Sequence, residues 1–148
     1  MVSMNHSFEL DCNEKKLFKI LTNYQNLAEF LPRKLQNLEI LDENENSTTL
    51  KVTLFLKTLI KKEFSQKLMI KKQSENDLSL DILDGHAKGT HVEISLSSKD
   101  NKTICAVNSD VKLSLKTIVL IPILKTEYNT FVLSVFKKMA LAANEIKI

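Results

Sequence analysis

The sequence predicts an α+β protein with a seven-stranded antiparallel sheet, two short helices after the first strand and one long C-terminal helix. Apolar and polar residues alternate in short runs from Ser3 to Lys116, which is typical of half-buried strands. At about Leu120 the apolar spacing changes to that of a helix. A chain of 148 residues, 43% of them hydrophobic, has the size of one domain, and we expect residues 1–148 to form it.

The first predicted elements are a strand and two short helices. Every second residue of Ser3–Leu10 faces one side, and that side is mostly apolar. Asp11 precedes Glu14 by three residues, a spacing typical of a helix start. We therefore expect a helix from this point to about Thr22, followed by a second short helix over Tyr24–Leu31.

Six further strands are predicted before the last helix. Each has apolar residues at every second position, so each presents one apolar face. Polar segments such as Asp42–Ser47 and Asp100-Asn101 separate neighbouring strands and predict turns. The expected strands are Leu35–Asp42, Thr49–Lys57, Lys61–Lys71, Asp77–Leu83, His91–Ser97 and Thr103–Lys116.

The last segment predicts an amphipathic helix from about Leu120 to Ile146. At about 1.5 Å per residue its length is roughly 40 Å. Pro122 suits the first turn of such a helix. One apolar helix lying across a large curved apolar sheet tends to leave space beneath it, and this space is where we expect the function.

Four segments resemble the START-like, or SRPBCC, superfamily. They are the strand-to-helix segment Leu10–Phe18, Tyr24 with Glu29–Pro32, Leu83–Gly85 and the final helix, and Glu29–Pro32 is most similar to the polyketide cyclase and coenzyme Q-binding branch. The resemblance implies the helix-grip fold, a curved sheet wrapped around the C-terminal helix. It also implies a cavity between them for a hydrophobic small molecule such as a lipid, an isoprenoid or quinone, or a polyketide-like compound.

The parity of the strands and the spacing of the last helix predict most of the side chains that line that cavity, and the resemblance adds Tyr24 and Phe30 from the second short helix. Ligand sites are usually apolar with a few placed polar groups. The predicted lining residues are His6, Tyr24, Phe30, Leu54, Leu56, Phe64, Gln66, Leu80, Val92, Ile94, Ser109, Tyr128, Phe131, Val132 and Val135.

Three of these residues carry chemistry if the protein is an enzyme. His6 faces inward and suits a general base, while Tyr24 and Tyr128 each combine a large ring with one hydroxyl that could orient a carbonyl or quinone oxygen. For each of them we favour a structural role, in which His6 bonds the backbone and the tyrosine hydroxyls reach the backbone or solvent. The sequence therefore favours a non-catalytic binding or transport protein, with a polyketide cyclase or dehydratase as the alternative.

Composition excludes several other classes. With two glycines the chain has no glycine-rich phosphate loop. Arg33 is the only arginine, which argues against base-specific nucleic-acid binding. His86 and His91 would need a third ligand to hold a metal and are expected to lie at the surface, so we predict no metal and no cofactor. Cys12 and Cys105 are far apart in the sequence and are predicted to stay reduced in the cytoplasm.

Lysines crowd one predicted hairpin, at Lys57, Lys61, Lys62 and Lys67. Such a cluster could contact anionic lipid headgroups for a short time, or it could only keep a sheet edge soluble. A third interpretation is a protein-interaction module, in which this surface or the sheet face binds a protein partner.

Overall fold

The computed structural model describes residues 2–31, 37–56, 62–114, 118 and 121–146; side chains are described for these except at 54–56, 62–64, 123, 124 and 126. The elements are β1 (Val2–Leu10), α1 (Glu14–Leu21), η1 (Tyr24–Phe30), β2 (Asn37–Glu43), β3 (Ser47–Leu56), β4 (Lys62–Lys72), β5 (Asp77–Ile82), β6 (His91–Lys99), β7 (Lys102–Val111) and α2 (Ile121–Asn144). The predicted fold class is confirmed.

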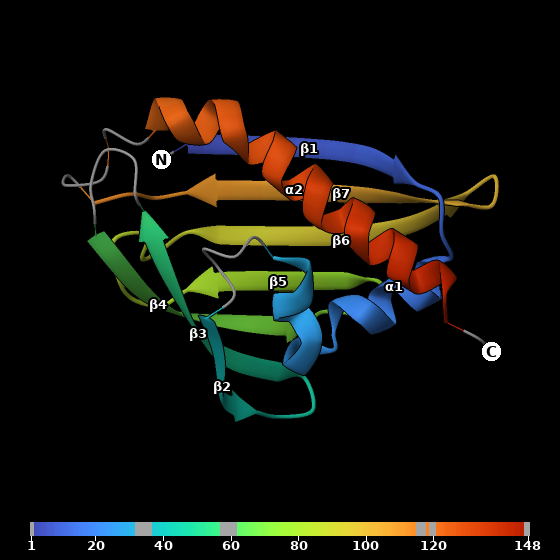
Figure 1. Cartoon of the computed structure of the whole chain (residues 1–148), viewed down its shortest axis with the longest axis horizontal. Helices are drawn as coiled ribbons and strands as arrows, with labels where there is room; N and C mark the ends of the chain where they lie inside the picture. The colour runs from blue at the N-terminus through green and yellow to red at the C-terminus, as the bar shows by residue number, and fades with distance from the viewer. Residues whose placement is uncertain (1, 32–36, 57–61, 115–117, 119–120, 147–148) are drawn as a thin grey trace.

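The seven strands form one sheet in the order β1-β7-β6-β5-β4-β3-β2, and every neighbouring pair is antiparallel. The chain meanders from β2 to β7, and β1 pairs with β7. Figure 1 shows α2 crossing one face of the sheet diagonally, with α1 and η1 on the same side. We call this the inner face and the opposite one the outer face.

The core lies between the inner face and the helices. Its fully buried side chains include Leu17 of α1, Leu50 of β3, Leu96 of β6 and Met139 of α2, each at most 2% exposed. Burying a Leu or Met side chain contributes about 1.5–3 kcal/mol, so this layer holds the helices against the sheet. Among the described helices, none is long and apolar enough to cross a membrane.

The start of α1 differs from the prediction. Asn13 is the N-cap, and its side-chain oxygen accepts a hydrogen bond from the backbone N–H of Lys16 at 3.1 Å. Glu14, expected as the partner of Asp11, is the first helical residue and accepts a bond from the Ser98 hydroxyl at 2.6 Å. Asparagine and aspartate cap helices about equally well, so local propensity did not distinguish these neighbours.

Strand β7 is shorter than the predicted strand Thr103–Lys116. It ends at Val111, and residues 112–114 have no regular structure. The backbone N–H of Lys112 donates to the Thr90 hydroxyl at 2.9 Å, and that of Ser114 donates to the His86 carbonyl at 2.8 Å. The connection between β5 and β6 thus takes the bonds that would have extended the strand.

The turn between β6 and β7 is at Asp100-Asn101, as predicted. These two residues have φ angles of 51° and 65°, and Lys99 pairs with Lys102 across them. Two left-handed residues are typical of the tight hairpin turn whose twist matches that of the flanking strands, and Asp and Asn tolerate that conformation.

Candidate ligand-binding site

The inner face carries rows of side chains that run across the strands. The register places Ser109 of β7 opposite Val92 of β6, and Val92 opposite Leu80 of β5. A parallel row places Val107 opposite Ile94. Leu80, Val92 and Ile94 are half-buried and pack against the core, while Ser109 is 1% exposed. The predicted inward orientation of these side chains is confirmed.

Helix α2 faces these rows with four residues at helical spacing. Val132 and Val135 are buried, and Tyr128 and Phe131 are half-buried against the core. Positions separated by three, four and seven residues share one face of a helix. The sheet rows and this stripe therefore present mostly apolar side chains to one another.

Three polar side chains interrupt this apolar surface where α2 meets β1 and β7, and we call His6, Ser109 and Tyr128 the polar cluster. The hydroxyl oxygens of Ser109 and Tyr128 are 2.6 Å apart, which is a hydrogen bond. The rings of His6 and Tyr128 have centroids 5.4 Å apart and are tilted by 40°. Three residues separated widely in the sequence thus meet where α2 lies over β1 and β7 (Figure 1).

The polar cluster contains one unpartnered atom. The Nε2 atom of His6 is buried and has no hydrogen-bond partner among the described residues. Burial raises the pKa of Tyr128, and the hydrogen bond with Ser109 lowers it by less. Its hydroxyl therefore keeps its proton at neutral pH and remains a hydrogen-bond donor.

Gln66 is a second inward polar residue, well separated from the polar cluster. It lies on β4, three strands from β7 in the sheet order, and its Oε1 is buried with no partner among the described residues. Gly85 packs against it: a Cβ atom there would lie 2.9 Å from Gln66 Cγ, and the φ angle of Gly85 is +80°. Glycine is needed at this position for both reasons.

Tyr24 and Phe30 are the first and last residues of η1, and both pack in the core. Tyr24, at the start of η1, is 4% exposed and belongs to the core cluster that contains Leu17 and Leu21. Burial, with a smaller effect of Glu43, raises its pKa to about 12. Phe30 is half-buried against the same core. Among the described residues, no hydrogen bond or ring contact joins Tyr24 to His6 or Tyr128, the other two residues considered as acid or base.

Three predicted lining residues fall where side chains lie outside the described part of the structure. Leu54 of β3 pairs with Phe64 of β4, and Leu56 is the last residue of β3. Lys57 and Lys61 of the lysine cluster also lie outside the described residues, as does the side chain of Lys62. Lys67 is exposed on the outer face of β4.

A groove that the sequence did not predict lies beside the β6–β7 turn. It has a volume of about 460 Å³ and is lined by the segment before α1, the β6–β7 turn and Asn144 of α2. Asn144 donates to the Asp11 carbonyl at 2.8 Å, and Ser98 to Glu14, so much of its polar lining is already bonded internally. The groove is open and polar, unlike the surface under α2.

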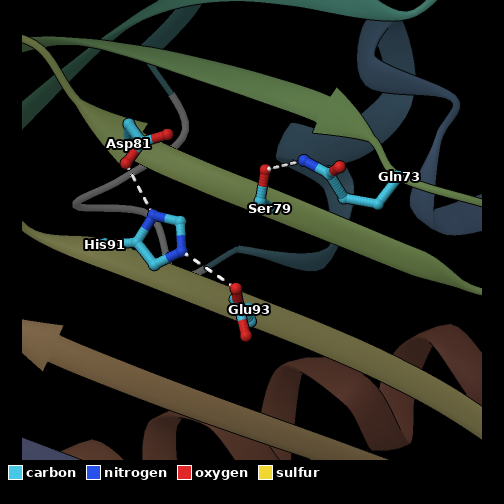
Figure 2. A network of polar contacts seen from close by, with 5 residues as sticks. All are labelled: Gln73, Ser79, Asp81, His91 and Glu93. Carbon is cyan, nitrogen blue, oxygen red and sulfur yellow. Dashed lines mark hydrogen bonds and ion pairs between the residues drawn. The ribbon is translucent and has the colours of Figure 1, made fainter.

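The outer face carries a second histidine-centred group, shown in Figure 2. His91 Nδ1 lies 2.6 Å from Asp81 Oδ1, and its Nε2 lies 3.2 Å from Glu93 Oε1. These bonds, first that to Asp81 and then that to Glu93, raise the pKa of His91. His91 lies on strand β6, and the nearby His86 bonds to Ser114 at 2.8 Å. No group of three potential metal ligands occurs among the residues with described positions.

The two cysteines are buried and free. Burial raises the pKa of Cys105 to about 12 and, more weakly, that of Cys12. A thiol with a raised pKa is a poor nucleophile at neutral pH. Neither cysteine therefore joins the candidate chemistry.

Comparison with known proteins reveals relatives in structure but not in sequence. No protein-family model matches the chain, and no curated protein matches it. Solved structures do match over nearly the whole chain, and the three described next are 10–12% identical to it in sequence. Such similarity establishes the fold and leaves the function open.

Three of these structures are representative. A START superfamily protein from Mycobacterium smegmatis has a TM-score of 0.78 at 12% identity, covering 95% of this chain and 97% of its own. An aromatase/cyclase from Streptomyces sp. R1128 has a TM-score of 0.72 at 10% identity, covering 93% of both chains. Norcoclaurine synthase from Thalictrum flavum, solved with dopamine and hydroxybenzaldehyde, has a TM-score of 0.74 at 12% identity, covering 99% of this chain and 89% of its own.

The chain therefore has the START-like helix-grip fold, as its sequence predicted. Two features define the candidate site on this fold: an apolar inner face opposed by the stripe of α2, and the polar cluster between them.

Proposed function

We propose that the protein binds a hydrophobic small molecule between the inner face of its sheet and α2. The observation that carries the proposal is a set of half-buried apolar side chains packed against the core, Leu80, Val92 and Ile94 on the sheet and Phe131 on α2. Half-buried apolar surface gains about 25 cal/mol per Å² when a ligand removes it from water. The fold neighbours support the same class, since they include a START superfamily protein and enzymes that act on small molecules.

The binding test uses N-phenyl-1-naphthylamine, a neutral dye that fluoresces in apolar surroundings. We expect saturable binding by the natural chain and a loss of at least about tenfold in affinity with Val92→Trp, which fills the inner face. Asn108→Trp is the matched control, because Asn108 is exposed on the outer face of β7. Absence of saturable binding, or equal losses in both variants, would contradict the proposal.

A second candidate function is dehydration of a β-hydroxyketone, the chemistry of a cyclase or dehydratase. The contact between the rings of His6 and Tyr128 favours it. His6 would take the proton from the carbon beside the carbonyl, and Tyr128 would donate to the departing hydroxyl, which leaves as water. Conversion of 4-hydroxy-4-phenyl-2-butanone to its enone tests this, and turnover that survives Tyr128→Phe unchanged would exclude the assigned role.

Brief contact with anionic membranes and a place in the reducing cytoplasm stay predictions. The free thiols of Cys12 and Cys105 fit the cytoplasm. Exposed lysines on the outer face of β4, Lys67 and Lys71, fit membrane contact. Flotation with phosphatidylserine vesicles that is lost in Lys67→Glu/Lys71→Glu would support that contact, and flotation that is absent or unaffected would remove it.

A further inference from the structure

We infer that the polar cluster of His6, Ser109 and Tyr128 holds a neutral oxygen atom of the ligand, a carbonyl or hydroxyl group, by hydrogen bonds. The inference rests on the proposed binding function and adds the chemistry of the ligand's anchored end. It predicts a preference among molecules that have the same carbon skeleton and differ only at one oxygen.

Counting hydrogens gives the first argument. Ser109 and Tyr128 each carry one O–H, and the 2.6 Å contact between their oxygens uses one of these two hydrogens. The second O–H is left to donate elsewhere. The pair can therefore donate one more hydrogen bond, and the two residues beside Ser109 in its row, Met4 and Val92, are apolar and cannot accept it.

The second argument comes from His6. Its Nε2 is one of two buried side-chain nitrogen or oxygen atoms without a partner among the described residues. Such atoms are rare in folded proteins and call for an explanation, for instance a bound group. A neutral imidazole nitrogen either donates or accepts, so Nε2 can bond a carbonyl or a hydroxyl. Its ring already lies against Tyr128, with centroids 5.4 Å apart, so one oxygen atom could satisfy both residues.

The residues around the polar cluster determine whether the ligand group bound there is charged or neutral. The inward positions of β1, β5, β6 and β7 carry no carboxylate and no ammonium group within the described ranges. The row through Ser109 continues into Met4 on one side and Val92 on the other. A buried ion without a partner is strongly disfavoured, so a neutral oxygen fits this position and a carboxylate or phosphate does not.

The experiment compares benzophenone with diphenylmethane, which lacks only the carbonyl oxygen. Dissociation constants are measured by displacement of N-phenyl-1-naphthylamine from the natural chain and from Tyr128→Phe/Ser109→Ala. We expect the ratio of the diphenylmethane constant to the benzophenone constant to fall about fivefold in that variant, the factor for one net hydrogen bond. Using a ratio cancels the difference in water solubility between the two ligands.

Ser79→Ala is the matched control. Ser79 is also a buried serine with a 2.8 Å side-chain hydrogen bond, but it lies on the outer face, where its hydroxyl bonds Gln73 (Figure 2). We expect Ser79→Ala to have the same ratio of the two dissociation constants as the unsubstituted protein. A second measurement is made on the natural chain: the ¹⁵N shift of His6 Nε2 should move with benzophenone and stay in place with diphenylmethane.

The outcomes separate the two proposals. If both ligands bind, the ratio is unchanged in Tyr128→Phe/Ser109→Ala and Nε2 does not respond, the anchoring inference is overturned while the binding function stands. If neither the dye nor either ligand binds, the proposed function itself fails and the inference with it. Should the double variant not fold, the single variant Tyr128→Phe and the Nε2 shift decide the question in the same way.

Discussion

His6 and His91 lie on opposite faces of the same sheet and have opposite hydrogen-bonding states. His91 on the outer face has both ring nitrogens bonded to carboxylates, at 2.6 Å and 3.2 Å. His6 on the inner face has a buried Nε2 with no partner among the described residues. A fully bonded surface histidine is accounted for by the stability of the fold. A buried nitrogen without a hydrogen-bond partner lowers the stability of the folded protein. Its presence on the inner face is therefore better explained by a bound ligand than by folding.

The largest expected loss of stability comes from a charged residue placed on the inner face of the sheet. Comparing it with the same change on the outer face tests whether the inner face is the buried one. Leu96 on the inner face is 1% exposed, and its neighbour Ser97 is exposed on the outer face. Leu96→Asp should lower the free energy of unfolding by about 4 kcal/mol or more, since it removes a core side chain and buries a carboxylate. Ser97→Asp should change it by less than about 0.5 kcal/mol. Urea unfolding followed by circular dichroism measures both, and similar losses would mean that the faces are wrongly assigned.

A smaller loss of stability is expected when the hydrogen bond between Ser109 and Tyr128 is removed. Tyr128→Phe leaves the buried Ser109 hydroxyl without its partner. The free energy of unfolding should fall by about 1 kcal/mol, the usual net value of such a bond. Urea unfolding of the variant measures the loss. An unchanged stability would show that the hydroxyl pair is not formed in solution.

Replacing His6, the residue of the polar cluster with an unpartnered atom, should change the stability in the opposite direction. His6→Phe keeps an aromatic ring beside Tyr128 and removes the unpartnered nitrogen, so the free energy of unfolding should rise, by up to about 1 kcal/mol. Stabilisation on removal of a polar group is typical of residues kept for function. The same unfolding assay without ligand gives the sign, and a clear destabilisation would indicate that Nε2 has a partner.

The smallest effect is a pH dependence from the outer face. Because the pKa of His91 is raised, its bonds to Asp81 and Glu93 stabilise the protein fully below the unfolded-state pKa of about 6.5. That contribution is lost as the pH rises through the higher folded-state pKa. The side chain is 38% exposed, so screening reduces the effect to a few tenths of a kcal/mol.

The matched variants for this pH effect are His91→Gln and His6→Phe. Urea midpoints between pH 5.5 and 8.5 should lose the decline above pH 6.5 in His91→Gln and keep it in His6→Phe. A decline that survives His91→Gln would assign the titration to another group.

Alternation along the strands was enough to predict the sheet, its two faces and the inward position of Ser109, because β7 pairs without a bulge from Lys102 to Val111. The helical spacing likewise placed Tyr128 on the inward stripe of α2. Neither pattern contains the angle at which α2 crosses the sheet, which is set by packing between distant segments. The meeting of His6 with Tyr128 therefore became visible only in the structure.

Two local predictions failed for a related reason. The cap of α1 is Asn13 rather than Asp11, a choice between residues of equal propensity. The end of β7 at Val111 depends on bonds from Lys112 and Ser114 to the β5–β6 connection. Interactions with a segment more than twenty residues away decided where the strand stops, and no nearby sequence signal reports them.

The most direct test of the central claim is the location of a bound apolar molecule. The measurement is of intermolecular nuclear Overhauser effects between N-phenyl-1-naphthylamine and the methyl groups of the ¹³C-labelled protein. The account predicts contacts with Val92 and Ile94 of the sheet and with Val132 and Val135 of α2. Contacts confined to exposed methyl groups such as those of Leu83 and Leu141, which are 39% and 69% exposed, would contradict it.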